Sequence, residues 1–172
     1  MKKTYLLPLG CLGLLLAFVA SPSRAQQHDY SSEDVLVQHL YESIESGPQH
    51  NPDWTDFNRL FIPEAKLGRI RDDGYELVSP AEFAANYDTL RARVVIQRFK
   101  EHEIGRTTER FGNVMHVFST YESDYATNEG PQKARGINSI QLIRQDNRWW
   151  VATIIWDVET LDRPIPSQYL NQ

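Results

Sequence analysis

Three polar side chains in the second half of the chain have the chemistry of a general acid–base site. Asp157 can give or take a proton, and Tyr121 and Asn138 can donate hydrogen bonds to a developing oxyanion. A carboxylate beside an apolar wall should have a raised pKa, which suits a general acid or base. Asp157, Tyr121 and Asn138 are therefore the candidate catalytic residues, provided that the strands carrying them bring them to one face.

Other kinds of site are not indicated. The five histidines show neither an HExxH motif nor a pair at i, i+4 spacing, so no metal site is expected. There is no glycine-rich phosphate loop and no GxSxG elbow, and no cofactor is expected. In Glu101-His102-Glu103 the two glutamates share one face of a strand and the histidine takes the other. A solvated edge strand explains this triplet better than a ligand cluster.

Four long strands must position the candidate residues. From Phe99 onward the hydrophobic period is that of strands, and turn residues separate them at 112–113, 128–131 and 146–147. Long strands joined by short turns predict an antiparallel meander. The predicted strands are 99–111, 114–127, 133–144 and 149–158.

The pairing of these strands follows from the turn lengths. A two-residue turn at Asp146-Asn147 and a four-residue turn at 128–131 each fix a register, and directly paired residues share a face. Asp157, Tyr121 and Asn138 then lie on the face that carries the aliphatic residues. An odd-length turn after Arg144 would flip the last strand and expel Asp157. The predicted pairs are Arg144–Trp149, Leu142–Val151, Ile140–Thr153, Asn138–Ile155, Gly136–Asp157, Tyr121–Asn138 and, on the other face, Asp124–Arg135.

Three helices are predicted in the first half of the chain. Apolar residues recur at helical spacing from Leu36 to Ile44, Asp53 can cap a short helix, and Ser79 with Glu82 forms a capping box before a third helix that ends near residue 92. Between the second and third helices, Asp73-Gly74 predicts a hairpin over 66–78. This order predicts an α+β domain whose helices cover one face of a curved antiparallel sheet. The expected ligand-binding residues of the space between them are Trp54, Phe57, Phe83, Tyr87 and Thr153.

Two segments resemble a known superfamily. Residues 53–61 (DWTDFNRLF) followed by Pro63-Glu64-Ala65 are similar to the second-helix motif of the nuclear transport factor 2-like (NTF2-like) superfamily, which includes SnoaL-like polyketide cyclases and ketosteroid isomerases. Residues 146–151 (DNRWWV) resemble its last strands. The resemblance covers about residues 32 to 160 and implies a cone-shaped α+β roll. It is nearly silent on activity, because the relatives include enzymes, binding modules and proteins without known function.

The N-terminus has the pattern of a secretory signal peptide. Lys2-Lys3 precedes an apolar run to Ala20, and Ser23-Arg24-Ala25 offers small residues where signal peptidase reads. A retained anchor or a lipoprotein at Cys11 are the weaker alternatives. We therefore expect a signal peptide at 1–25, one domain at 26–162 and an extended tail at 163–172, exported to the periplasm or secreted and free of the membrane after cleavage.

Composition and charge describe an ordinary globular domain, 41% hydrophobic and 24% charged, with a net charge of -5. The acidic balance argues against nucleic-acid binding, because phosphate contacts need clustered basic residues. The sheet face away from the helices is predicted to be apolar, which indicates a homodimer interface. The residues expected on that face are Ile137, Ile143, Trp150, Ile154 and Trp156.

Three functions remain open at this point. The first is an exported module that binds a small, mostly apolar ligand between helices and sheet. The second is a cofactor-independent lyase, isomerase or hydrolase that uses Asp157 with Tyr121 and Asn138. The third is a structural dimer.

Overall fold

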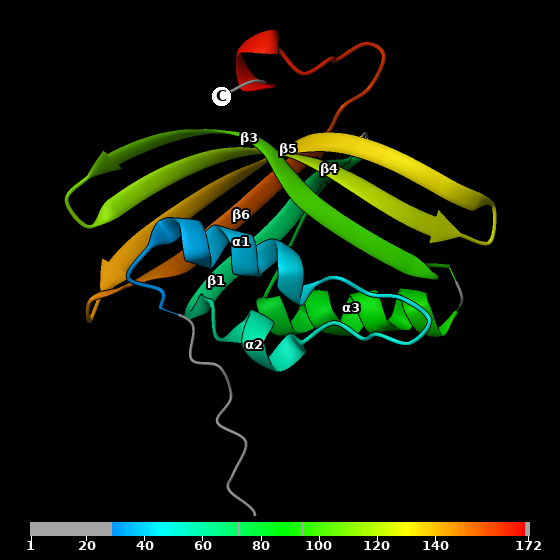
Figure 1. Cartoon of the computed structure of the whole chain (residues 1–172), viewed down its shortest axis with the longest axis horizontal. Helices are drawn as coiled ribbons and strands as arrows, with labels where there is room; N and C mark the ends of the chain where they lie inside the picture. The colour runs from blue at the N-terminus through cyan, green and yellow to red at the C-terminus, as the bar shows by residue number, and fades with distance from the viewer. Residues whose placement is uncertain (1–28, 72, 94, 171–172) are drawn as a thin grey trace, which may run out of the picture.

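The computed structural model describes residues 29–71, 73–93 and 95–170. Three helices pack on a six-stranded, mostly antiparallel sheet, which confirms the predicted α+β class (Figure 1). The predicted signal peptide at 1–25 lies outside the described residues. None of the helices in the described ranges is long and apolar enough to cross a membrane. The elements are α1 (Glu33–Ser43), α2 (Trp54–Asn58), β1 (Phe61–Arg71), β2 (Gly74–Val78), α3 (Pro80–Ala92), β3 (Arg98–Phe111), β4 (Val114–Thr127), β5 (Gly130–Gln145), β6 (Arg148–Val158) and the 3₁₀ turn η1 (Ser167–Tyr169).

Two of the three helices, α2 and α3, begin where a short polar side chain accepts from a free backbone N–H group. The Glu82 N–H donates to Ser79 Oγ at 3.2 Å, and the Ser79 N–H donates to Glu82 Oε2 at 2.8 Å, so the predicted capping box is present at the start of α3. Asp53 caps α2 by accepting from the Asp56 N–H at 3.0 Å. These caps fix the helices that cover the sheet.

The strand order is β2-β1-β6-β5-β4-β3, and β1 runs parallel to β6. The β5–β6 turn has two residues, Asp146 and Asn147, both with positive φ as a tight hairpin turn requires. The β4–β5 turn also has two residues, so the predicted four-residue turn is wrong and Tyr121 pairs with Gly136. This error of two positions leaves every side chain on its predicted face. On the other face Arg135 pairs with Glu122, whereas Asp124 pairs with Lys133.

Two β-bulges change which side chains face the helices. In β6, Val151 pairs with Leu142 but Thr153 pairs with Gln141, so Ala152 is an extra residue. In β3, Glu103 pairs with Tyr121 but Gly105 pairs with Thr120, so the residue between them is extra. A bulge of one residue moves every following side chain to the opposite face. The predicted pairs beyond the β6 bulge are therefore wrong: the observed pairs are Ile140–Ile154, Asn138–Trp156, Ile137–Asp157 and Gly136–Val158.

The core lies between the helices and the concave face of the sheet, and the C-terminal segment lies across the convex face (Figure 1). Ile165 is buried there, and Thr120 Oγ1 donates to the Tyr169 carbonyl at 2.7 Å. The tail thus covers part of the face predicted to form a dimer, and it ends in a 3₁₀ turn rather than fully extended. Ile154 and Trp156 lie on the concave side instead. The homodimer stays a prediction, without these two residues in its interface.

Candidate functional site

A cavity of about 330 Å³ lies between the helices and the concave face of the sheet. Its walls come from α1, α2, α3 and five of the six strands, and most of them are apolar or aromatic. Along each strand, alternate side chains point toward the helices, and residues three or four apart on a helix point toward the sheet. These two periodicities bring the wall residues together. The aromatic residues of the wall are Tyr41, Phe57, Phe83, Tyr87, Phe99, Tyr121, Tyr125 and Trp156.

Three of the five predicted ligand-binding residues line this cavity: Phe57, Phe83 and Tyr87. Trp54 packs behind them, with its ring centroid 5.5 Å from Phe57 and 5.4 Å from Tyr87, and it does not line the space. Thr153 points to the convex side because it follows the β6 bulge. The predicted contact of Thr153 with a ligand is not supported by this arrangement.

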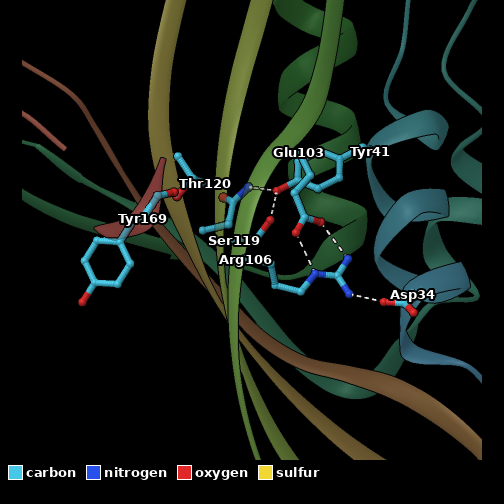
Figure 2. A network of polar contacts seen from close by, with 8 residues as sticks. Asp34, Tyr41, Glu103, Arg106, Ser119, Thr120 and Tyr169 are labelled. Carbon is cyan, nitrogen blue, oxygen red and sulfur yellow. Dashed lines mark hydrogen bonds and ion pairs between the residues drawn. The ribbon is translucent and has the colours of Figure 1, made fainter. Parts of the chain in front are cut away.

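Tyr121 and Asn138 both line the cavity, as their parity predicted. Asn138 Nδ2 donates to the Tyr41 hydroxyl at 3.0 Å, and that hydroxyl lies 2.7 Å from Ser119 Oγ. Figure 2 shows Tyr41 and Ser119 turned toward one another. Burial raises the pKa of Tyr121 and of Tyr41 above the usual range, so both hydroxyls remain neutral at physiological pH.

Asp157 does not join them. It pairs with Ile137 on the convex side, where its Oδ1 accepts from Arg163 Nη2 at 3.0 Å and from the Val158 N–H at 2.8 Å. The β6 bulge turns Trp156 into the cavity in its place. The predicted convergence of Asp157 with Tyr121 and Asn138 is therefore wrong.

The carboxyl group in the cavity belongs to Glu101 on β3. Burial raises the pKa of Glu101 to about 8, and the Asn138 side chain partly opposes this by hydrogen bonding to the charged form. No basic side chain is among the causes that set this pKa. Below about pH 8 the group is therefore mostly a neutral acid inside an apolar wall.

Sequence reasoning missed Glu101 by assigning its triplet to a solvated edge. His102 is indeed exposed, but the β3 bulge gives Glu101 the same face as the buried Ser123 opposite it. Counting from the Gly112-Asn113 turn without a bulge would place Glu101 on the convex face. One signal was available: Gly105 interrupts the strand, and an isolated glycine in a strand often marks a bulge. A Cβ on Gly105 would lie 2.5 Å from the Tyr169 carbonyl oxygen and would clash with it. The lack of a side chain at this position therefore leaves room for the C-terminal segment.

No family model matches the sequence, and no curated protein matches it. Solved structures do match. An NTF2-like superfamily protein from Salmonella enterica serovar Typhimurium aligns with a TM-score of 0.52 and 14% identity over 67% of this chain and 80% of that one. The association domain of CaMKII from C. elegans gives 0.51 and 15% over 71% and 89%. A protein of unknown function from Mycobacterium tuberculosis gives 0.56 and 20% over 78% and 77%.

The chain has the NTF2-like fold. This confirms the resemblance seen in the two sequence segments and the predicted roll. At these identities the likeness shows the fold alone, so the activity must be argued from the cavity of this chain.

An ion cluster ties α1 of the NTF2-like roll to the bulged region of β3. Arg106 donates from Nε and Nη2 to the two carboxylate oxygens of Glu103 at 2.6 and 2.7 Å, and from Nη1 to Asp34 (Figure 2). On a regular strand, residues three apart point to opposite faces. The bulge between Glu103 and Gly105 puts Arg106 and Glu103 on one face, so this pair holds the bulge that turns Glu101 inward.

Metal ligation is not indicated by the side chains described. No group of three or more His, Cys, Asp or Glu residues in the described ranges is arranged to hold a metal ion. What the site offers is hydrogen bonding, one titratable carboxyl group and an aromatic wall.

Proposed function

We propose that this NTF2-like domain binds a small, mostly apolar molecule in the cavity between its helices and its sheet. One observation carries the proposal: an aromatic-walled pocket of about 330 Å³ lies between the helices and the sheet, beside a partly buried carboxyl group. Protein interiors are otherwise packed to nearly crystalline density, whereas the apolar walls of this pocket, which is partly open to solvent, lack such dispersion contacts. A bound molecule of matching shape would restore those contacts.

The polar groups of the cavity give such a ligand an orientation. Glu101, Tyr121 and Asn138 lie together on neighbouring strands, whereas Phe57 and Phe83 come from the helical side. Ligand sites commonly combine an apolar wall with a few placed polar groups that fix orientation. We therefore expect the ligand to place one polar end against β3, β4 and β5.

A thermal-shift screen of steroid-like, polyketide-like and aromatic compounds tests this proposal. Hits are expected to raise the melting temperature, and Ala134→Phe should abolish the shift because Ala134 lines the cavity. Ala81→Phe, at an exposed position of α3, is the matched control and should leave the shift unchanged. Hits that bind equally well to the filled variant would contradict the proposal.

A second candidate function is acid–base catalysis without a cofactor, as a lyase, isomerase or hydrolase. The observation that favours it is a carboxyl group whose pKa of about 8 lies near neutrality, in a cavity that also presents the Tyr121 hydroxyl. Glu101 would then be the general acid or base, the role that the sequence analysis predicted for Asp157. Once a substrate is known, Glu101→Gln should lower turnover by orders of magnitude with little change in affinity, and loss of affinity alone would favour simple binding.

We also propose that the protein is exported, on the pattern of residues 1–25. N-terminal sequencing of material recovered outside the cytoplasm should give a start at Gln26. Recovery of chains that start at Met1 from a membrane fraction would contradict this proposal.

A further inference from the structure

We infer that the ligand carries a positively charged group, an amine or a quaternary ammonium, and that this group pairs with Glu101. The inference rests on the proposed function, because it assigns the charge of the molecule that fills the cavity. It goes beyond that function by naming the chemical class of the ligand.

The strand register surrounds Glu101 with aromatic rings. Phe99 precedes it by two residues on the same face of β3. Ser123 lies directly opposite on β4, so Tyr121 and Tyr125 are its diagonal neighbours across the strand pair. Diagonal pairs of this kind are within reach of aromatic side chains. Three rings and one carboxyl group therefore share one wall of the cavity.

The helices contribute further rings to the same space. Tyr87 of α3 makes an edge contact with Phe99, with 6.0 Å between ring centroids. Tyr41 of α1 lies close enough for the Glu101 charge to raise its pKa. Aromatic rings beside a carboxylate form the kind of wall that can stabilise an organic cation, through cation–π attraction and direct charge pairing.

Within the described part of the chain, no basic side chain contributes to the pKa of Glu101 in the cavity. Among the described residues that line it, the one basic side chain is Arg69, which is exposed on β1 at the far side of the strand order. Each ion pair found in the described ranges involves other carboxylates, including Glu103 with Arg106. A buried carboxylate normally has a partner, since burial of an unpaired charge is costly. A cationic ligand would supply the missing partner.

An anionic ligand does not fit this wall, because it would meet the Glu101 charge in a medium of low dielectric constant. A neutral ligand could accept a hydrogen bond from the protonated acid. It would bury apolar surface against the rings but would gain no cation–π attraction from them. A cation gains from both the carboxylate and the rings. The wall composition therefore favours a cation over either alternative.

Binding of a permanent cation should depend on pH through Glu101. The charged or titratable groups that line the cavity with Glu101 are Tyr41 from α1, Tyr87 from α3, Tyr121 and Tyr125 from β4 and Arg69 from β1, and Glu103 shares its strand. Burial raises the pKa values of Tyr41, Tyr87 and Tyr121, so these three do not ionise below pH 9, and Glu103 is held by Arg106. Of the groups whose pKa is shifted, Glu101 is the one that changes charge between pH 6 and 9.

The direction of the effect follows from linkage. A cation binds the ionised form of Glu101, and in the free protein that form is a small fraction below the pKa of about 8. The association constant should rise about tenfold from pH 6 to 7, about fivefold from pH 7 to 8, and less than about twofold above that.

The test compares two molecules of nearly the same shape by titration calorimetry: phenyltrimethylammonium, a permanent cation, and tert-butylbenzene, its neutral counterpart. At pH 9 the cation should bind at least about tenfold more tightly to the wild-type protein, with the pH dependence given above. Glu101→Gln removes the charge and keeps the shape, so it should abolish the pH dependence and reduce the preference to the part that the rings supply. At pH 6, where Glu101 is mostly protonated, tert-butylbenzene should bind the variant and the wild-type protein equally well.

The possible outcomes separate the charge inference from the proposed function. If tert-butylbenzene binds as tightly as the cation at pH 9, the charge inference fails and the proposed function stands. If uncharged compounds of the thermal-shift screen bind but phenyltrimethylammonium does not, the inference fails in the same way. If no compound of either kind binds, both fail. A preference for the cation that stays undiminished in Glu101→Gln would overturn the role of Glu101.

Discussion

Strands β3 and β6 each carry a carboxylate and a one-residue bulge, and the two bulges have opposite consequences. On β3 the bulge before Gly105 turns Glu101 into the cavity. On β6 the bulge at Ala152 turns Asp157 out to the convex face and brings Trp156 in. The position of a carboxylate in this roll is therefore decided by the local strand irregularity and not by its distance from a turn.

The surroundings of the two groups differ as much as their positions. Asp157 is partly exposed and bonded to Arg163 and to the Val158 N–H, which is an ordinary surface arrangement. Glu101 lies in an apolar space without a basic partner, and its raised pKa reflects the cost of charging it there. A carboxyl group that is kept at a cost in stability is a better candidate for a functional role than a carboxylate in an ordinary surface pair. Four predictions test this comparison.

Glu101→Gln should have the largest effect on stability, and only at high pH. The folded pKa of about 8 lies above the ordinary 4.5, so wild-type stability is full below about pH 4.5 and is lost as pH rises to about 8. At about 1.4 kcal/mol per pH unit, the difference of about 3.5 between these two pKa values corresponds to a loss on the order of 5 kcal/mol. Urea unfolding should show the variant equal to wild type at pH 4 and more stable at pH 9. Equal pH profiles would contradict the burial of the charge.

Trp156→Ala should be more costly than Trp150→Ala. Trp156 lines the cavity and makes an edge contact with Phe83, with 6.1 Å between ring centroids. Trp150 precedes the bulge and lies on the convex face, under the Arg148 guanidinium. We expect a loss of about 3 kcal/mol for Trp156→Ala and about 1 kcal/mol for Trp150→Ala in the free energy of unfolding. Equal losses would indicate that both rings share one face and that the β6 bulge is absent.

Arg106→Gln should destabilise the β3 side by about 1–2 kcal/mol. The substitution leaves the partly buried Glu103 carboxylate without its two hydrogen bonds and releases Asp34 of α1. Lys100→Gln on the same strand is the control, since Lys100 is exposed beside Glu45 and should cost less than about 0.5 kcal/mol. Urea unfolding at pH 7 measures both, and equal small losses would remove Arg106 as a support of the bulge.

Asp157→Asn should have the smallest effect. Its pair with Arg163 is exposed, so the loss should be below about 1 kcal/mol, with no change in the affinity of any cavity ligand. Calorimetric titration of a ligand from the screen into this variant provides the measurement. A drop in affinity of tenfold or more would return Asp157 to the site.

The fold was open to prediction because its signals are local. The Ser79–Glu82 capping box and the Asp146-Asn147 turn each specify one backbone geometry, and both are present. The face of Tyr121 and Asn138 was also correct, although the β4–β5 turn was misjudged, because an error of two positions preserves parity. The parallel pairing of β1 with β6 has no local signal and was not predicted.

The carboxylate of the site could not be predicted by counting from turns. An extra residue in the middle of a strand reverses parity, and nothing about Ala152 as a residue type marks it as the bulge. Gly105 was a sequence signal for the bulge in β3, but the charged residues next to Glu101 favoured the prediction of a solvent-exposed strand. The two bulges therefore place Glu101 in the cavity and Asp157 on the convex face, the reverse of the prediction.

The most direct test of this account is a ¹³C NMR titration of the glutamate side-chain carboxyl groups between pH 4 and 10, with Glu101→Gln to assign the resonance. The account predicts that one glutamate titrates with a midpoint near pH 8 and that its signal is missing in the variant. Addition of phenyltrimethylammonium should move that midpoint downward, because the cation favours the ionised form. A Glu101 midpoint between pH 4 and 5 in the free protein would contradict the placement of a desolvated carboxyl group without a basic partner in the cavity.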